Sequence, residues 1–302
     1  MSYPYVVLDV FTDRPLAGNP LAVLPEALGL DEARMQAIAA EFNLSETVFV
    51  FPPERPVHSA RIRIFTPRQE LPFAGHPTIG TALVVARRMA GSDQRGRETM
   101  LMLEENVGAV RCGVFIKNGN SGHVLFDAPR LPEPVAVTLE REALAAALGL
   151  TPGEIGFENH QPSAFTAGVP YAFVPVRGLD AIARAKANSA AWAHAFSGQV
   201  NGAFLYCRET VGPNHGFHAR MFAPELGIVE DPATGSAAVA FAGVVQRFDE
   251  PTTGKHRTVI EQGFEMRRPS LMTLEIDIER GEITVVRLGG DAVVVAEGLL
   301  DV

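Results

Sequence analysis

The sequence has little of three things that mark common classes of protein: cysteine, positive charge and long apolar runs. Its two cysteines, Cys112 and Cys207, form no CxxC pair, which argues against a disulfide scaffold, a zinc knuckle and a redox pair. Lysine and arginine (26) are outnumbered by aspartate and glutamate (35), for a formal net charge of −9, so the basic footprint of a nucleic-acid-binding protein is missing. No apolar run approaches the roughly 18 residues of a membrane span. We therefore expect neither nucleic acid nor a membrane as a partner.

Signatures of the common nucleotide, nicotinamide and hydrolase classes are also missing. There is no P-loop, dinucleotide fingerprint, GxSxG or HExxH pattern, and His215 and His218 lack the spacing and third ligand of a zinc site. Residues Met1 to Asp9 contain no basic secretory segment, so we expect a cytoplasmic protein. What remains is a globular composition, 47% hydrophobic and 20% charged, in a chain of 302 residues that is long enough for two domains.

One sequence pattern occurs twice: a short loop with Gly, Pro and Thr leads into a helix that is apolar on every side. The first runs from 71–78 into 79–86, and the second from 230–236 into 237–245. Such a helix is normally buried, so each is expected to form the axis of its own domain. The N–H groups at a helix start attract anions. If the two loops face one another, the cleft between the halves is the active site.

Short apolar segments separated by turn residues predict strands around both helices. The Pro-rich stretch 128–134 is the expected link, because proline cannot join a sheet interior and stiffens a connection. We place the domains at 1–128 and 129–289; the last segment, about 290–302, is a candidate to complete the first domain, but the sequence leaves it open to either half. The expected strands are 5–11, 21–24, 47–51, 58–65, 99–104, 108–116, 122–126, 171–176, 202–207, 218–222, 258–261, 271–278 and 283–288, and the expected outer helices are 31–42, 139–148 and 180–196.

The first loop offers His76, which lies between Gly75 and Pro77. Because proline is favoured at the first helical position, His76 is expected at the N-cap, where the positive end of the helix disfavours its protonation. A neutral histidine there can donate or accept a hydrogen bond, and Gly75 would let a ligand approach the backbone. The alternative is a capping or packed histidine without a chemical role.

The second loop offers Asp231, Gly235 and Ser236. Aspartate before proline is a common helix cap, so Asp231 either acts on a ligand or only caps the helix. The N–H groups around Gly235 and Ser236 match a carboxylate.

Glu46 lies between an expected helix and an apolar strand that contains Val48 and Phe49. The negative end of the helix and partial burial would raise the pKa of its carboxyl toward the range that suits proton transfer. The alternative is a solvated loop acid.

Taken in order, a set of short motifs resembles the phenazine-biosynthesis PhzF-like family. The matches run from the first strand to the last, so the resemblance covers nearly the whole chain; each motif is modest, and the ordered set is specific. The motifs are Gly18-Asn-Pro-Leu-Ala22, Asn43-Leu-Ser-Glu-Thr47, Ile64-Phe-Thr-Pro67, Glu70-Leu-Pro-Phe-Ala-Gly-His-Pro-Thr78, Arg220-Met-Phe-Ala-Pro224, Glu230-Asp-Pro-Ala-Thr-Gly-Ser-Ala237, Gln262-Gly263 and Arg268-Pro-Ser270.

The resemblance implies the diaminopimelate epimerase-like fold. This is an α+β fold of two pseudo-symmetric domains, each a barrel-like, mostly antiparallel β layer around a central apolar helix, with the active site between them and usually as a homodimer. No metal, flavin or pyridoxal cofactor is implied. Epimerases and racemases of this fold use a pair of cysteines, one at each loop. Neither loop here contains cysteine, which disfavours a two-thiol racemase.

The resemblance also implies a chemistry: Glu46 is the acid/base of an isomerase, and His76, Asp231 and Ser236 fall on the family's cleft residues. We expect a proton to move within a small metabolite that bears a carboxylate; in the phenazine enzyme the substrate is cyclic. The carboxylate is expected to lie at the N–H groups of Gly75, Gly235 and Ser236. Two alternatives stay open. One is an epimerase or racemase with Glu46 and Asp231 as opposed bases, and the other is a non-catalytic small-molecule-binding protein.

Overall fold

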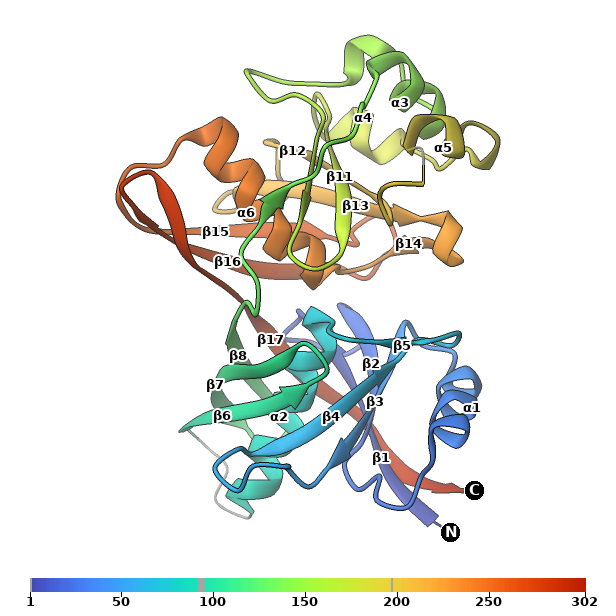
Figure 1. Cartoon of the computed structure of the whole chain (residues 1–302), viewed down its shortest axis with the longest axis vertical. Helices are drawn as coiled ribbons and strands as arrows, with labels where there is room; N and C mark the ends of the chain where they lie inside the picture. The colour runs from blue at the N-terminus through green and yellow to red at the C-terminus, as the bar shows by residue number, and fades with distance from the viewer. Residues whose placement is uncertain (1, 92–95, 197) are drawn as a thin grey trace. The chain divides into compact units, whose positions relative to one another are not determined.

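The chain folds into two compact units in a computed structural model that describes residues 2–91, 96–196 and 198–302 (Figure 1). Unit 1 comprises Met1–Pro129 and Leu288–Val302, and unit 2 comprises Arg130–Arg287. None of the helices in the described part of the chain is long and apolar enough to cross a bilayer.

Eight strands pair into a closed ring in unit 1, with β17 contributing its part from Leu288; Figure 1 shows these strands around α2. The strands are β1 (Ser2–Val10), β2 (Asn19–Leu24), β3 (Glu46–Phe51), β4 (Ala60–Phe65), β6 (Arg97–Glu105), β7 (Gly108–Asn118), β8 (Ser121–Asp127) and β17 (Glu282–Asp301), with a short β5 (Glu70–Leu71) on β4. Pairing runs in the order β17–β1–β2–β3–β4–β6–β7–β8, and β8 returns to β17. The pairs β2–β3 and β4–β6 are parallel, because a helix crosses over between the two strands of each.

Helix α2 (Gly75–Ala90) forms the core of this ring. Every residue from Gly75 to Ala86 is buried, and the helix contacts β1, β2, β3, β6, β7 and β8. The prediction of a helix buried on every side is confirmed. Helix α1 (Glu32–Phe42) instead packs on the outside through Met35 and Ile38. The N-cap of α1 is Asp31, whose Oδ1 accepts the Arg34 N–H at 2.8 Å.

Unit 2 repeats the connectivity of unit 1. The pairings β10–β11, β12–β13, β13–β14 and β15–β16 are antiparallel and β11–β12 and β13–β15 are parallel, the same succession as from β1 to β7. This repeat confirms the predicted pseudo-symmetric α+β fold. Its elements are β9 (Glu133–Pro134), α3 (Arg141–Leu148), β10 (Ser163–Thr166), β11 (Pro170–Pro175), α4 (Leu179–Arg184), α5 (Ser189–Phe196), β12 (Ala203–Cys207), β13 (Phe217–Ala223), β14 (Ile228–Asp231), α6 (Gly235–Asp249), β15 (Gly254–Gln262) and β16 (Ser270–Glu279), with 3-10 turns at Pro152–Glu154 and Pro224–Leu226.

Helix α6 is the central helix of unit 2. The ring of Phe241 lies 4.8–5.8 Å, centroid to centroid, from four aromatic rings on β11, β12 and β13. Aromatic pairs at these separations are stabilised beyond simple area burial. Gly243 on the same helix meets the Phe165 ring of β10, because a Cβ there would lie 2.5 Å from the ring. The second predicted central helix is therefore confirmed.

Two expected elements are corrected. The helix predicted at 180–196 is two helices, α4 and α5, because Arg220 Nη1 donates to the carbonyls of Ile182, Ala183 and Ala185. Because these carbonyls accept hydrogen bonds from Arg220, the hydrogen-bond ladder of α4 ends there. The strand predicted at 283–288 extends to Asp301 as β17, whose residues from Leu288 belong to unit 1.

The closure of the unit 1 ring generates a test of its packing. A Cβ at Gly289 of β17 would lie 2.8 Å from Leu125 Cδ1 and 2.9 Å from the Val124 carbonyl oxygen of β8. We expect Gly289→Ala to lower the free energy of unfolding by about 1–3 kcal/mol, because the added methyl overpacks the strand pair. Gly153→Ala is the control: a Cβ there meets nothing within 4 Å, so its effect should stay within about 0.5 kcal/mol. Equal denaturation midpoints for the two variants would contradict the expectation.

Candidate active site

Glu46, His76 and Asn19 come together beside the first turn of α2. Glu46 is the first residue of β3 and Asn19 the first of β2, and these parallel strands pair Leu21 with Glu46. Glu46 Oε2 lies 3.2 Å from His76 Nε2, and Asn19 Nδ2 lies 3.3 Å from His76 Nδ1. All three side chains are buried, with Glu46 9% and His76 4% exposed. Glu46 is therefore not a solvated loop acid.

The histidine of this group is neutral and its tautomer is defined. Burial lowers the pKa of His76 to about 3, because a cation loses its hydration in the interior. An amide nitrogen only donates, so His76 Nδ1 accepts from Asn19 Nδ2 and the ring hydrogen sits on Nε2. His76 Nε2 lies 3.2 Å from Glu46 Oε2, and the two atoms are not aligned for a hydrogen bond. The arrangement places a neutral ring beside a carboxyl group.

The place of His76 in the helix is a correction. The N-cap of α2 is Ala74, and His76 is the second helical residue. The helix starts earlier than Pro77 predicts because the Thr78 N–H already bonds the Ala74 carbonyl at 3.2 Å. Proline is tolerated anywhere in the first turn, where N–H groups have no partner within the helix. The backbone N–H groups of Gly75 and His76 therefore lie in the first turn, at the electropositive end of α2.

In unit 2, Asp231, Gly235 and Ser236 lie together at the start of α6. Asp231 is not the N-cap as expected, because the helix begins at Gly235 and its N-cap is Thr234. Asp231 instead ends β14, and its Oδ2 accepts the Thr234 hydroxyl at 2.6 Å. Ser236 Oγ lies 2.7 Å from the Tyr171 hydroxyl of β11. The N–H groups of Gly235 and Ser236 occupy the first turn, as those of Gly75 and His76 do in α2.

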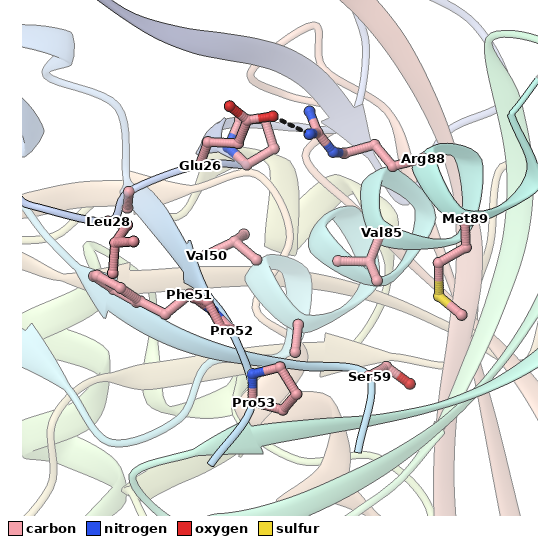
Figure 2. A pocket seen from close by; sticks show the side chains of 13 residues that line it. Glu26, Leu28, Val50, Phe51, Pro52, Pro53, Ser59, Val85, Arg88 and Met89 are labelled. Carbon is pink, nitrogen blue, oxygen red and sulfur yellow. Dashed lines mark hydrogen bonds and ion pairs between the residues drawn. The ribbon is translucent and has the colours of Figure 1, made fainter. Parts of the chain in front are cut away.

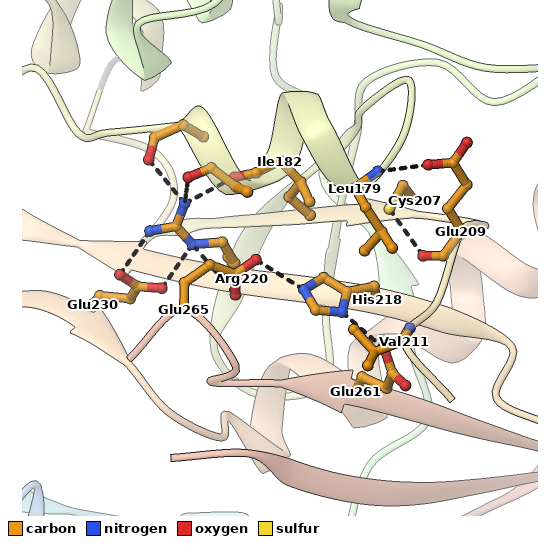
Figure 3. A network of polar contacts seen from close by, with 12 residues as sticks. Leu179, Ile182, Cys207, Glu209, Val211, His218, Arg220, Glu230, Glu261 and Glu265 are labelled. Atoms are coloured by element: carbon orange, nitrogen blue, oxygen red, sulfur yellow. Dashed lines mark hydrogen bonds and ion pairs between the residues drawn. The ribbon is translucent and has the colours of Figure 1, made fainter. Parts of the chain in front are cut away.

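A buried ionic network in unit 2 fixes the strand that leads to Asp231 (Figure 3). Arg220 of β13 binds Glu230 through two hydrogen bonds of 2.8 Å, a bidentate geometry that defines the position of both side chains. His218 lies 2.8 Å from Glu261 and 3.0 Å from Glu265. Burial alone would lower the pKa of His218, but these two carboxylates outweigh it and raise that pKa to about 9. Within the described residues, no group of three or more His, Cys, Asp or Glu is arranged to hold a metal ion.

A pocket of about 440 Å³ lies in unit 1, but at the other end of α2 (Figure 2). Its lining includes Val85 and Met89 of the helix and Leu28 and Phe51 around them. The ion pair of Arg88 with Glu26 accounts for both charged residues of the lining. A helix rise of 1.5 Å per residue puts Met89 about 20 Å from His76 along the axis. This pocket is therefore separate from the Glu46 and His76 group.

Sequence reasoning missed four polar residues that the structure places at these helix starts: Asn19, Glu105, Tyr171 and Gln262. Asn19 and Gln262 occur within the motifs that carry the family resemblance, which was the available signal. Glu105 gave no such signal, because it is the second of two adjacent glutamates at the end of β6, and only the structure shows that it is buried. Tyr171 reads as an ordinary β-former. These four residues contact their partners only because strands that are far apart in the sequence pack side by side.

The comparisons with known proteins address the family. The sequence model of PhzC-PhzF, described as phenazine biosynthesis-like protein, matches residues 8–298. The chain belongs to this PhzF-like family. It is 50% identical over 300 residues to an uncharacterized isomerase of Mesorhizobium japonicum, with 98% of each chain covered. It is 35% identical over 297 residues to trans-2,3-dihydro-3-hydroxyanthranilate isomerase of Pseudomonas fluorescens, again with 98% of each covered. The predicted family and enzyme class, isomerase, are confirmed.

Solved structures of the PhzF-like family share the fold. A PhzF-family protein of Bacillus anthracis superposes with a TM-score of 0.89 at 24% identity, over 100% of both chains. A predicted epimerase of Pseudomonas aeruginosa gives a TM-score of 0.79 at 30% identity, over 99% of both. A hydroxyproline epimerase of Agrobacterium vitis gives 0.63 at 13% identity, covering 99% of this chain and 92% of its own. The last similarity extends the shared fold to the epimerases.

The protonation state of His76 generates a direct test. We expect the ring to stay neutral between pH 5 and 8 with its hydrogen on Nε2, because burial holds the pKa at about 3. Between about pH 3 and 6.5 an unfolded chain binds a proton that folded His76 does not, so this residue makes the folded state less stable as pH falls. Nitrogen-15 NMR of labelled histidine measures tautomer and titration. His76→Gln assigns the signal, and a midpoint between pH 6 and 7 would refute the neutral form.

Proposed function

We propose that this PhzF-like isomerase moves a proton within a small carboxylate-bearing metabolite, without a metal or organic cofactor, and that Glu46 is its acid/base. The observation that carries the proposal is the buried pair of Glu46 Oε2 and His76 Nε2 at 3.2 Å. A carboxylate within reach of a neutral, fixed donor can take up a proton and return it without forming a trapped ion pair.

The proton transfer follows from these groups. Ionised Glu46 removes a proton from an activated carbon of the substrate and returns it to another carbon, so the substrate is isomerised and Glu46 is regenerated. The neutral His76 ring, with Nε2 at 3.2 Å from Glu46 Oε2, stabilises the ionised carboxylate before the transfer. A positioned acid/base contributes ~10²–10⁴-fold to the rate, and the remainder has to come from holding the substrate anion and from excluding water.

The proposed anion-binding groups are the first-turn N–H groups of the two central helices. In unit 1 these belong to Gly75 and His76, and in unit 2 to Gly235 and Ser236, with Asp231 proposed to bind a polar group of the substrate. The free partial charges at a helix start favour a carboxylate by about 0.3–1 kcal/mol or more when partly buried. Participation of unit 2 residues in the reaction is tested by Ser236→Ala, which should raise KM more than it lowers kcat.

The first compound to test is trans-2,3-dihydro-3-hydroxyanthranilate, because isomerases named for it are 34–35% identical to this chain over nearly its whole length. It is a cyclic carboxylate, which fits the proposed substrate class. A homodimer and a cytoplasmic location remain proposals that rest on the sequence. Light scattering of the purified protein measures the oligomeric state.

A thiol-based racemase is disfavoured by the positions of both cysteines. Cys112 and Cys207 are buried in β7 and β12. Burial raises the pKa of the Cys112 thiol well above its ordinary value and that of Cys207 to about 12. A thiol at such a pKa is not the thiolate that proton abstraction requires.

Glu46→Gln is the test of the acid/base. The amide keeps the shape of the side chain and cannot accept the substrate proton, so we expect kcat to fall ~10²–10⁴-fold with the fold retained. Incorporation of solvent deuterium into the substrate, followed by NMR, should fall in parallel. Glu98→Gln is the control, because Glu98 is exposed on β6 and its loss should leave turnover unchanged.

The outcomes separate the alternatives. Full turnover by Glu46→Gln would remove Glu46 from the chemistry. Inversion of a substrate stereocentre with exchange of its α-proton would favour an epimerase that uses Glu46 and Asp231. Tight carboxylate binding without any deuterium incorporation would favour a binding protein.

A further inference from the structure

Glu105 is a buried carboxyl group that the proposed mechanism does not use. It is the last residue of β6 and is 8% exposed. Its Oε1 lies 2.8 Å from the Thr78 hydroxyl in the first turns of α2, and its Oε2 has no hydrogen-bond partner among the described residues. An ionised carboxylate in such a place would cost free energy, because each oxygen of a charged carboxylate is stabilised by more than one hydrogen-bond donor.

Counting hydrogens at Thr78 indicates the state of Glu105. The Thr78 hydroxyl has one hydrogen, yet its oxygen lies 2.8 Å from the Ala74 carbonyl as well as 2.8 Å from Glu105 Oε1. The carbonyl can only accept, so when the hydroxyl donates to it, the second contact needs a hydrogen from Glu105. A neutral carboxylic acid satisfies both contacts at once. Burial acts in the same direction and raises the pKa of Glu105 to about 8, against a lowering by the Thr78 contact.

Unit 2 has a neutral amide in the equivalent place. Gln262 ends β15 as Glu105 ends β6, and both strands follow their central helix; β15 is parallel to β13, and β6 is parallel to β4. Gln262 is fully buried. Its Oε1 accepts the Thr234 N–H at 3.1 Å, and its Nε2 donates to the Asp231 carbonyl at 2.6 Å. Both repeats thus place a buried polar side chain against the start of their central helix.

We infer that Glu105 is a positioning residue for the proposed reaction: as a neutral acid it donates to Thr78 and so fixes the first turn of α2, which carries Gly75 and His76. This inference rests on the proposed function for its catalytic consequence, but not for the state of the carboxyl group. Loss of the Glu105 proton would leave one hydroxyl hydrogen for two acceptors. The Thr78 hydroxyl could then bond either the Ala74 carbonyl or Glu105, but not both.

The charged groups around Glu105 are few and are paired elsewhere. On α2 His76 is neutral, and Arg87 and Arg88 pair with Glu297 and Glu26. On β7 the Cys112 thiol is buried, and Arg111 and Lys117 pair with Asp127 and Asp291. Glu104, the preceding residue, accepts the Glu54 and Arg55 N–H groups and contacts His58. Glu70 of β5 is bound to Arg63. No cation among these groups compensates an ionised Glu105.

The pH dependence has a definite sign. Between the ordinary glutamate pKa of 4.5 and about 8, the folded chain keeps a proton at Glu105 that the unfolded chain has released. The free energy of unfolding therefore falls as pH rises through this window. Glu105→Gln supplies the donor and acceptor of Gln262 without an ionisable group. It should leave the fold intact and remove this loss of stability.

The experiment compares thermal unfolding of wild type, Glu105→Gln and the neighbouring control Glu104→Gln between pH 5 and 9, with no substrate present. We expect the Tm advantage of Glu105→Gln over wild type to grow by at least about 5 °C across this range. Glu104→Gln should show no such growth. Infrared spectroscopy should detect a protonated carboxyl band at pH 7 that Glu105→Gln lacks. A constant Tm difference together with no such band would overturn the neutral acid.

The positioning role is tested by the pH profile of kcat, measured with a compound that the wild-type protein isomerises. Wild-type kcat should decline above about pH 8, and Glu105→Gln should abolish that decline while keeping kcat at pH 7 within about twofold. Glu105→Leu and Thr78→Val, which break the contact, should lower kcat by about 10- to 100-fold with KM little changed. Normal activity in Glu105→Leu and Thr78→Val would refute positioning. Because the unfolding and infrared measurements need no turnover, they stand even if the proposed function fails.

Discussion

The burial of α2 on all sides is the constraint from which the candidate site follows. A central helix surrounded by strands has no access to water at its first turn, so its orphan N–H groups and the polar side chains nearby must find partners in the protein or in a ligand. The barrel meets this need with groups at strand ends, where the backbone ladder stops. Asn19, Glu46 and Glu105 are such groups, and each ends or begins a strand beside α2.

The same burial defines the chemistry of these groups. Low polarity keeps His76 neutral, and Asn19 then decides which ring nitrogen carries the hydrogen. A neutral donor next to Glu46 differs from a cation there, because it supports the carboxylate without lowering its basicity by a full charge. The function of the pair thus depends on desolvation as much as on distance.

The internal repeat shows two solutions to one packing problem. Both central helices begin next to the last residue of a parallel strand, and that residue is an acid in unit 1 and an amide in unit 2. In unit 2 Arg220 of β13 binds Glu230 of β14, and at the same stage of unit 1 Arg63 of β4 binds Glu70 of β5. The two units therefore share a scaffold and this ion pair, and they differ in the residue that ends the strand beside the helix start.

The sequence determined the two buried helices, the outer helix after Asp31 and the α+β class, because hydrophobic periodicity and capping are local properties of the chain. Its ordered motifs also indicated the family. It could not place the starts of α2 and α6, since proline is compatible with several first-turn positions. It could not divide 180–196 into two helices either, because the carbonyls there are taken by Arg220 from a strand far along the chain. Only the tertiary structure brought Glu46 to His76, Glu105 to Thr78 and the end of β17 to unit 1, because these contacts depend on strand pairing between segments with no local signal for one another.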